Sequence, residues 1–387
     1  MSKLACTLAA LLVLAGFATA QTATPPLHTS GTRILDSHNR PVQLRSVNWY
    51  GFDQKEFVAG GLDHSSLDTI AGLIGQMGFN SVRLPWANET VEHNPIVADS
   101  ALTANPQFHG KHSLDIMDAV IAALTRRHIM VILDNHMSDA DWCCSEQDEN
   151  GLWYNARYPE SAWLADWKFM VRRYAGNPWV IGADLRNELR SGAAWGGSDP
   201  KLDWHAAAER GGNAVLSANP KLLIFIEGPR YSTSFSAFPG LPVHLSRPDR
   251  AVISPHAYSI GHSYKSYDEA ATALDREFTP LLTAPNPTPI WVGEFGQCTM
   301  GRCEAYGNQW VSWFAQWANE HHVWNTSWWA LNATESSGRS RTLGEPETYG
   351  LLTLDWKHVR SPQIITVIDS IHPDDATSAD ARERTSR

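Results

Sequence analysis

The feature that most constrains the fold of this 387-residue chain is a regular alternation of strand-like and helix-like segments. Eight short apolar runs have the length and composition of buried strands, at residues 44–49, 79–84, 128–134, 179–187, 222–227, 251–258, 290–295 and 325–331. Segments with helical apolar spacing accompany them, at residues 67–77, 113–126, 160–174, 204–217, 267–278, 304–321 and 362–371. This repeated order, without an intervening linker, predicts a single α/β domain folded as a TIM (β/α)8 barrel.

Three segments lie outside the repeated pattern. Residues 1–20 combine an early lysine, an apolar centre and an Ala-Thr-Ala end, which is typical of a signal peptide. Residues 32–35 and 41–44, with a polar turn at 36–39, predict a small N-terminal hairpin. Residues 373–387 form a polar, charged tail. We therefore expect the barrel to occupy residues 25–372 of a secreted protein, extracellular or periplasmic.

The charge of the chain argues against two classes of partner. Its formal net charge of -10 is unfavourable for nucleic acids and anionic membranes, because both bind basic surfaces. No apolar run is long enough to span a bilayer. The 17 tryptophans offer flat apolar faces on which sugar rings can stack, but tryptophan also fills cores, so composition alone does not decide between these uses.

Polar and aromatic side chains recur where the predicted strands end. In a TIM barrel the catalytic groups come from the carboxyl ends of the strands, where the following loops gather. The strand-end residues are Asn48, Trp49, Arg83, Asp134, Asn135, His136, Asn187, Glu188, Glu227, His256, Tyr258, Glu294, Trp328 and Trp329. Because the strand interiors stay apolar, this pattern predicts a cleft for a polar substrate that contains rings.

Two glutamates among these residues indicate the chemistry. Glu188 ends the fourth predicted strand and Glu294 the seventh, so they should face each other across the barrel mouth. Glycoside hydrolysis requires such a pair, with one carboxyl group protonated and the other ionised. Arg83 would favour the ionised form of Glu294 if it lies beside it. Each of these residues also has a simpler interpretation: Glu188 could cap the following helix, and Arg83 could form a salt bridge that only ties strands together. Glu227 is a third acid at a strand end and a rival to the pair, but we take it as a rim or structural residue.

Several of these segments together resemble the cellulase-type family 5 glycoside hydrolases of the retaining (β/α)8 clan. The resemblance covers residues 28–371. It is carried by Asn48-Trp49-Tyr50-Gly51-Phe52, Val82-Arg83-Leu84-Pro85-Trp86, Leu133-Asp134-Asn135-His136, Asp184-Leu185-Arg186-Asn187-Glu188, Ser254-Pro255-His256-Ala257-Tyr258, Trp291-Val292-Gly293-Glu294-Phe295-Gly296 and Trp329-Ala330-Leu331-Asn332.

The resemblance implies roles for the residues at the end of the fourth strand and for its partner. Glu188 matches the acid/base of the family and Glu294 matches the nucleophile. Asn187 matches the residue that holds the 2-hydroxyl of the sugar at the cleavage site. The chain departs from the family at Leu189, where proline is usual. We expect this change to affect the loop and not the chemistry.

Other matched residues would surround the two glutamates. Arg83 and Tyr258 match groups that hydrogen-bond and orient the nucleophile. His136 and His256 match a pair that lines the site, with His256 near the acid/base. Trp329 matches the tryptophan under the sugar at subsite -1. All of these roles are implied by the resemblance.

Further tryptophans are candidates for sugar contacts. Trp49, Trp86, Trp142, Trp153 and Trp195 fall at strand ends or in loops on the same face of the predicted barrel. Trp49 is the strongest of them because it belongs to a matched segment, and we expect it to bind substrate.

Four cysteines remain after the predicted signal peptide, and they allow three pairings. Cys298 and Cys303 are close enough in sequence to form a bridge that clips the loop after Glu294, and we favour this pairing. Cys143 and Cys144 would then be a vicinal pair or free thiols. Alternatively, the two loops are cross-linked to each other across the barrel mouth.

We expect no metal and no cofactor. Residues 146–151 resemble the start of a calcium loop, but Arg157 stands where such a loop has its closing acid. Asp134, His136 and His256 could in principle hold a metal, but the chemistry of two glutamates requires none.

The sequence thus predicts a secreted, monomeric, retaining endo-β-1,4-glucanase whose partner is a polysaccharide, β-glucan. One alternative is the same mechanism on mannan, xyloglucan or a glucosyl lipid, with the choice made by the loops at residues 142–153 and 192–204. The other is a carbohydrate-binding barrel without catalysis. The intact set of predicted active-site residues argues against that second alternative, since binding alone needs few of them.

Overall fold

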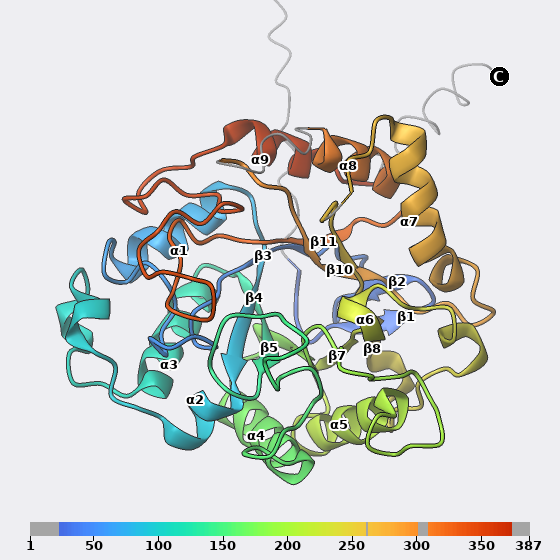
Figure 1. Cartoon of the computed structure of the whole chain (residues 1–387), viewed down its shortest axis with the longest axis horizontal. Helices are drawn as coiled ribbons and strands as arrows, with labels where there is room; N and C mark the ends of the chain where they lie inside the picture. The colour runs from blue at the N-terminus through green and yellow to red at the C-terminus, as the bar shows by residue number, and fades with distance from the viewer. Residues whose placement is uncertain (1–22, 261, 301–308, 374–387) are drawn as a thin grey trace, which may run out of the picture.

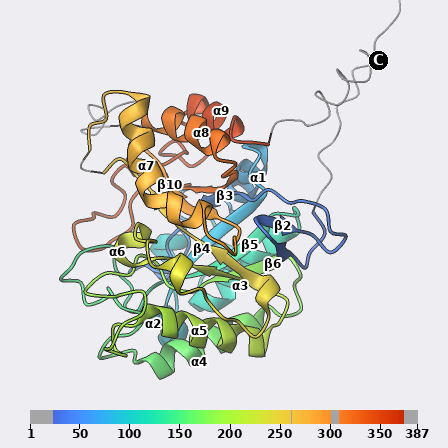
Figure 2. The same ribbon diagram turned by 90° about the vertical axis from the view of Figure 1, so that its right-hand side faces the viewer.

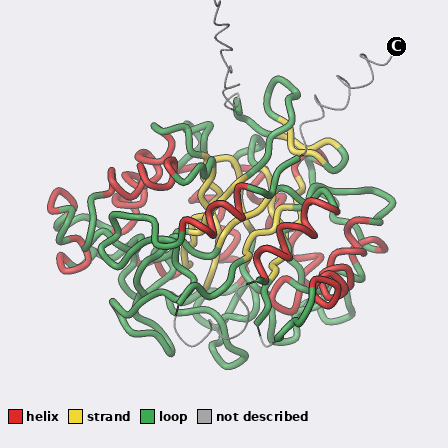
Figure 3. The backbone as a smooth tube through the Cα atoms, turned by 90° about the horizontal axis from the view of Figure 1, so that it is seen from above, coloured by secondary structure: helices red, strands yellow, loops and turns green. Residues whose placement is uncertain are grey.

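The computed structural model describes residues 23–260, 262–300 and 309–373 of the chain. The predicted signal peptide and residues 374–387 of the predicted tail lie outside these ranges. A curled parallel sheet occupies the centre and helices surround it (Figure 1). Seen from above, strands gather in the middle of the molecule with helices on their outer side (Figure 3). The prediction of a TIM barrel is confirmed.

The central sheet is parallel throughout, in the order β8-β7-β6-β5-β4-β3-β11-β10-β9. Its strands are β3 (Arg45–Asn48), β4 (Ser81–Ala87), β5 (Met130–Met137), β6 (Val180–Asp184), β7 (Leu223–Ile226), β8 (Ala251–Ile253), β9 (His256–Ala257), β10 (Trp291–Phe295) and β11 (Asn325–Trp328). Nearly all of their residues are buried, because helices cover the outer face while side chains fill the interior.

The predicted strand at residues 251–258 is divided into β8 and β9 at Ser254 and Pro255. Proline has no backbone N–H to give to a strand ladder, which explains the break. β8 pairs with β7, and β9 pairs with β10. The broken strand therefore connects the two ends of the sheet and closes the barrel.

The helices form the outer layer, as the side view also shows (Figure 2), except the short α6, which follows β7 at the open end of the barrel. They are α1 (Leu67–Gln76), α2 (Asn88–His93), α3 (Ser113–Thr125), α4 (Glu160–Arg173), α5 (Trp204–Ala218), α6 (Pro229–Ser232), α7 (Tyr267–Leu282), α8 (Trp310–Glu320) and α9 (Pro362–Asp369). Short 3-10 turns lie at η1 (Asp99–Leu102), η2 (Pro106–Phe108), η3 (Phe238–Gly240) and η4 (Pro248–Arg250). None of the helices in the described ranges is long and apolar enough to cross a membrane.

Three of the long helices begin at capping side chains, whereas α3, α4 and α8 have no side-chain cap. Ser66, Asp203 and Ser266 each accept a backbone N–H of the first turn, in α1, α5 and α7 respectively. The predicted helix at residues 304–321 begins in a segment outside the described residues, and its described part is α8. α2 and α6 were not predicted, because each is too short to show an apolar period.

The N-terminal hairpin exists, but its strands differ from the predicted ones. β1 (His28–Ser30) pairs with β2 (Arg33–Leu35) in an antiparallel ladder. Residues 41–44, the predicted second arm, contribute only an isolated bridge between Pro41 and Leu35. Asp36 accepts the backbone N–H groups of His38 and Arg40 and folds the intervening turn tightly. Pro41 cannot donate to a continuing ladder.

Candidate active site

A cavity of about 610 Å³ opens at the carboxyl ends of the strands. Its wall comes from the ends of β5, β6, β9, β10 and β11 and from the loops that follow them. Seven predicted site residues line it, namely His136, Asn187, Glu188, His256, Tyr258, Glu294 and Trp329. Arg83 lies beneath it, in hydrogen-bond contact with Glu294 and Asn187. The size is typical of a small-molecule or sugar site.

Glu188 and Glu294 face each other with His256 between them. One carboxylate oxygen of each glutamate and one ring nitrogen of His256 all lie within 4.8 Å of one another. His256 Nδ1 is 3.1 Å from Glu188 Oε1 and 3.6 Å from Glu294 Oε2. Carboxyl groups about 5–5.5 Å apart are typical of retaining glycosidases, whereas inverting ones leave roughly 6.5–9.5 Å for a water. The separation therefore favours direct attack by a carboxylate.

Glu294 is 5% exposed and receives hydrogen bonds on both of its oxygens. Arg83 Nη1 donates to Oε1 at 2.7 Å and the Tyr258 hydroxyl donates to Oε2 at 2.8 Å. Burial and the charge of Glu294 raise the pKa of Tyr258 well above its ordinary value, so the phenol keeps its proton. Donors on both oxygens fix the orientation of this carboxylate in the site.

Arg83 is fully buried and binds several acids besides Glu294. Its other contacts are Asp184 at 2.8 Å, Glu227 at 2.9 Å, Asp134 at 3.2 Å and the amide oxygen of Asn187 at 2.9 Å. Burial raises the pKa of Asp134 to about 8 and that of Asp184 to about 6, against the lowering effect of Arg83. One guanidinium thus organises the floor of the site. Since Arg83 takes the amide oxygen of Asn187, the NH2 group of Asn187 can donate to a ligand.

We expect Arg83→Met to destabilise the fold by roughly 3–5 kcal/mol, because removing one partner leaves buried carboxylates uncompensated. The free energy of unfolding from urea titration measures this effect. Arg172→Met is the matched control, since Arg172 is exposed on α4. An equal, small change in both variants would contradict a role for Arg83 in holding the floor together.

Glu188 follows β6 in a left-handed backbone conformation, with φ 44°. A non-glycine residue adopts this conformation only where its surroundings hold it. Here the Glu188 N–H donates to Glu227 Oε2 at 2.7 Å, and the Glu188 carbonyl accepts from Arg190 Nη1 at 2.8 Å. In the helical layer, the indole N–H groups of Trp163 and Trp167 on α4 both donate to the carbonyl of residue 185.

Glu227 therefore has a structural position and does not lie on the rim, since it is fully buried. The sequence favoured a rim or structural residue at Glu227, with a rival acid as the alternative, and its contact with the backbone of Glu188 was not predicted. Its place at the end of β7, next to Gly228 and Pro229, was the available signal.

The two partners of the Glu188–His256 pair have pKa values shifted in opposite directions. Burial raises the pKa of Glu188, but the hydrogen bond and charge of His256 outweigh it and hold this pKa below its ordinary value. Burial lowers the pKa of His256, but Glu227, Glu294 and Glu188 outweigh it and raise this pKa well above its ordinary value. In the empty site the pair thus holds one proton, which resides on the imidazole.

Aromatic rings form a stack beside the two glutamates. Trp329, at the end of β11, is stacked on Tyr50 at 5.3 Å between ring centroids and on His136 at 5.5 Å. His136 Nδ1 is 2.7 Å from Asp134 Oδ2, which fixes the orientation of the imidazole. Burial lowers the pKa of His136. Tyr50 was not singled out from the sequence, although it belongs to a matched segment.

The prediction that Trp49 contacts substrate is wrong. Its side chain is fully buried in the core, and its Nε1 donates to the carbonyl of Gly60 at 3.0 Å. Side chains alternate along a strand. Asn48 points into the barrel, where its amide binds the carbonyl of Gly293. The next residue must therefore point outward, into the helical layer.

The other four tryptophan candidates differ in whether their side chains line the cavity. Trp86 and Trp153 are fully buried, and Trp195 is 8% exposed and stacked on Phe238. Trp142 alone among the five candidates lines the cavity, in edge contact with Trp329 at 6.1 Å. It comes from the loop after β5.

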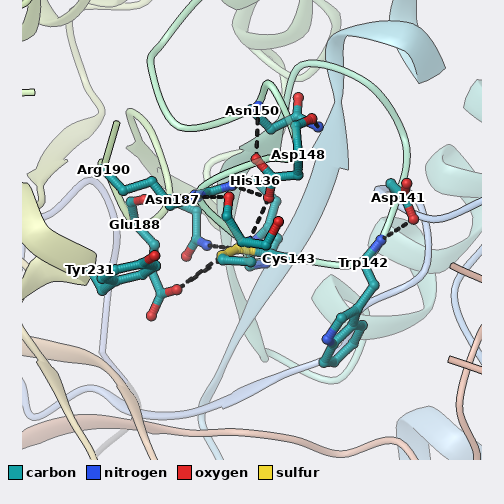
Figure 4. Close-up of a disulfide and its surroundings, with 12 residues drawn as sticks. His136, Asp141, Trp142, Cys143, Asp148, Asn150, Asn187, Glu188, Arg190 and Tyr231 are labelled. Carbon is teal, nitrogen blue, oxygen red and sulfur yellow. Dashed lines mark hydrogen bonds and ion pairs between the residues drawn. A yellow bond between two sulfur atoms is a disulfide. The ribbon is translucent and has the colours of Figure 1, made fainter. Parts of the chain in front are cut away.

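The cysteines follow one of the alternatives left open by the sequence. Cys143 and Cys144 are joined to each other as a vicinal disulfide on the cavity wall (Figure 4). Cys298 is disulfide-bonded. Cys303 lies outside the described residues, so the pairing of Cys298 with Cys303 stays a prediction. In the loop that resembles a calcium site, Asp148 binds Arg190.

Comparison with known proteins decides the family. The model of the cellulase family (glycosyl hydrolase family 5) matches residues 35–335. The chain belongs to glycosyl hydrolase family 5. This family 5 chain is therefore a glycoside hydrolase, as the resemblance implied.

Two relatives of this hydrolase are named endoglucanases. An endoglucanase of Paenibacillus polymyxa is 31% identical over 87% of this chain and 84% of its own length. The major extracellular endoglucanase of Xanthomonas campestris pv. campestris is 32% identical over 86% of this chain and 68% of its own length. The solved catalytic domain of the major endoglucanase from Xanthomonas campestris pv. campestris has a TM-score of 0.78 at 27% identity, covering 89% of this chain and 99% of that domain.

Proposed function

We propose that this hydrolase is a retaining endo-β-1,4-glucanase that acts outside the cytoplasm and cleaves internal bonds of soluble β-glucan chains as a monomer. The observation that carries the proposal is the short separation, within 4.8 Å, between oxygens of Glu188 and Glu294 in an open cavity. A glucan chain lying across this cavity would place one glycosidic bond between the two carboxyl groups.

In the first step, Glu294 attacks the anomeric carbon while Glu188 gives its proton to the departing glycosidic oxygen. The bond between the anomeric carbon and that oxygen breaks, and an ester with Glu294 forms. Arg83 and Tyr258 hold the attacking carboxylate through one hydrogen bond to each oxygen. The proton that Glu188 needs is the one it shares with His256.

In the second step, Glu188 takes a proton from water as that water attacks the anomeric carbon and releases Glu294. The ester has removed the negative charge of Glu294, and loss of a nearby like charge favours the ionised form of its neighbour. Glu188 thereby changes from acid to base. Two inversions at one carbon leave the product in the β configuration.

The relatives and the aromatic stack support a glucan as substrate. Two relatives are named endoglucanases, one of them extracellular. A variant of the Pyrococcus horikoshii endocellulase was solved in complex with cellotetraose, and its fold matches 91% of this chain with a TM-score of 0.77 at 25% identity. Trp329 lines the cavity, where its ring can contact a glucose ring of the substrate. The signal-peptide pattern of residues 1–20 supports export.

A substrate panel tests this proposal. Carboxymethylcellulose, mixed-linkage glucan, xyloglucan, mannan and a glucosyl lipid are each incubated with the enzyme, and products are sized. We expect the first two to be cleaved fastest, with viscosity falling before reducing ends accumulate. Proton NMR of freshly released cello-oligosaccharides should show the β anomer first. Initial release of the α anomer would contradict the retaining mechanism, and faster cleavage of another polymer would reassign the substrate.

A further inference from the structure

The vicinal disulfide is placed directly against the proposed acid/base. Cys144 Sγ lies 3.0 Å from Glu188 Oε2, and Cys143 Sγ lies 3.7 Å from the same oxygen. Cys143 Sγ also lies 3.5 Å from the amide nitrogen of Asn187. Figure 4 shows the sulfur atoms beside the carboxylate of Glu188 and the side-chain amide of Asn187. The disulfide therefore touches both residues at the end of the β6 segment that the mechanism uses.

The chemistry of a disulfide explains why its contact with Glu188 matters. A thiol can donate a weak hydrogen bond, whereas a disulfide sulfur carries no hydrogen and cannot donate. Glu188 Oε1 already faces His256 Nδ1. Oε2 faces the two sulfurs, so this oxygen meets no donor from the disulfide and is available to carry a proton. Two thiols at the same place would be donors toward Oε2 and would favour the ionised carboxylate.

The loop that carries the disulfide is fastened to the segment that carries Glu188. Arg190 donates to the carbonyl of Ser145 at 3.1 Å and to the carbonyl of Glu188 at 2.8 Å. It therefore joins the two segments beside the disulfide. On the other flank, Trp142 contacts Trp329, and the guanidinium of Arg341 lies 3.5 Å from the centre of the Trp142 ring. The disulfide is thus held on both sides.

We propose that the Cys143–Cys144 disulfide is a positioning element for general acid catalysis, which holds the Glu188 side chain and keeps its Oε2 oxygen free to protonate the leaving group. The inference rests on the proposed role of Glu188 as acid/base. A bridge between neighbouring residues joins no distant parts of the chain, so its closed loop is too short for a large entropic stabilisation of the fold. Its contacts with Glu188 and Asn187 at the cavity indicate a role in the active site.

The test compares wild type with Cys143→Ala/Cys144→Ala on two aryl β-cellobiosides. 2,4-Dinitrophenol departs without protonation, whereas phenol needs an acid. We expect kcat/KM to fall about 10–100-fold for the phenyl substrate, within the range that general acid catalysis contributes, and less than about 3-fold for the dinitrophenyl substrate. Equal losses on both substrates, or no loss on either, would overturn the proposal.

Reduction provides a second measurement on the unaltered enzyme. A phosphine and one water convert the disulfide to two thiols and a phosphine oxide. The same selective loss on the phenyl substrate should follow in wild type and be absent in the double variant, where these sulfurs are missing. The double variant is the control for the bridge at Cys298, which the phosphine can also reduce. An equal response of both proteins would assign the effect to Cys298 and overturn the proposal.

The outcomes separate this inference from the proposed function. If wild type hydrolyses both cellobiosides and Glu188→Ala shows the leaving-group selectivity while the double cysteine variant does not, only the role of the disulfide fails. A wild type inactive on both cellobiosides and on every glucan would overturn the proposed function, and this inference with it. Mass spectrometry of unreduced peptides that finds free thiols at residues 143 and 144 would overturn the inference alone.

Discussion

Glu294→Ala is expected to lower kcat/KM on carboxymethylcellulose and on aryl cellobiosides by about 10⁴-fold or more, the scale seen when the residue that forms the covalent intermediate is removed. Its carboxylate would be the group that bonds to the anomeric carbon, and both of its oxygens are already held by Arg83 and Tyr258. Glu188, the proposed acid/base, lies on the opposite wall and cannot replace the nucleophile. We therefore expect the loss for good and poor leaving groups alike.

Substrate binding and folding should survive this substitution. The variant loses one buried carboxylate. Arg83 nevertheless keeps its contacts with Asp134, Asp184 and Glu227, so the buried guanidinium stays paired with acidic side chains. Calorimetric titration with cellotetraose should give a Kd within a few-fold of the wild-type value, and thermal unfolding should show a folded protein. Glu92→Ala on α2 is the matched control, because Glu92 is exposed and does not line the cavity.

A mechanism-based label gives an independent measurement of the same role. A 2-deoxy-2-fluoro-β-cellobioside with a good leaving group slows the second step and allows the ester to accumulate. Peptide mass spectrometry should find the added sugar on Glu294. A label on Glu188, or normal turnover by Glu294→Ala, would contradict the assignment of the nucleophile.

The barrel and much of the candidate site were predictable because the same local signal recurs. In β5 an apolar run ends in Asp134, Asn135 and His136, and in β10 an apolar run ends in Glu294. A polar group at the end of a buried strand is costly unless a cavity receives it. In a parallel barrel all such ends meet on one face. Local pattern and global topology therefore point to the same residues.

Trp49 was assigned wrongly because the face of a side chain depends on strand register. A shift of one residue exchanges the barrel interior for the helical layer. Both Asn48 and Trp49 belong to the matched segment, and the hydrogen bond of Asn48 to Gly293 shows that Asn48 is the one that points inward. That contact joins residues 245 positions apart, so no local pattern could reveal it.

Contacts between loops could not be predicted from the sequence either, because they join residues that are far apart in the chain. Glu227 accepts the N–H of Glu188 from 39 residues away, and Cys144 reaches Glu188 from 44 residues away. Each loop by itself reads as a polar connection after a strand. Their meeting depends on how β5, β6 and β7 adjoin in the closed sheet. The roles of Glu227 and of the disulfide could therefore be inferred only after the strands were placed.

Glu188→Ala is expected to lower kcat/KM on carboxymethylcellulose by about 10²–10⁴-fold, the range attributed to general acid–base catalysis. For 2,4-dinitrophenyl β-cellobioside the first step needs no acid, so the ester with Glu294 should still form. Its hydrolysis lacks a base and becomes slow. We therefore expect a burst of dinitrophenol followed by a low steady rate, measured by stopped-flow absorbance.

Azide should restore turnover of that substrate, because it is an anion that attacks the ester without giving up a proton. We expect the steady rate to rise about 10-fold or more, which recovers part of the rate lost with the missing base. The product should be β-cellobiosyl azide. The Glu92→Ala control should show no response to azide. An α-azide product would mean that attack occurs on the substrate itself and would contradict a retained ester.

The pH profile adds a test of the shared proton. Catalysis needs that proton on the Glu188–His256 pair, so activity should persist below the pKa at which the pair loses it and fall as the pH rises through that value. His256 sets this limit, because three carboxylates raise its pKa well above the ordinary value despite its burial. Glu188→Ala has no acid to deprotonate. Wild-type kcat/KM for the phenyl cellobioside should therefore fall at alkaline pH, whereas kcat/KM of Glu188→Ala for the dinitrophenyl substrate, whose first step needs no acid, should stay level. An alkaline fall that persists in the variant would assign that proton to another group.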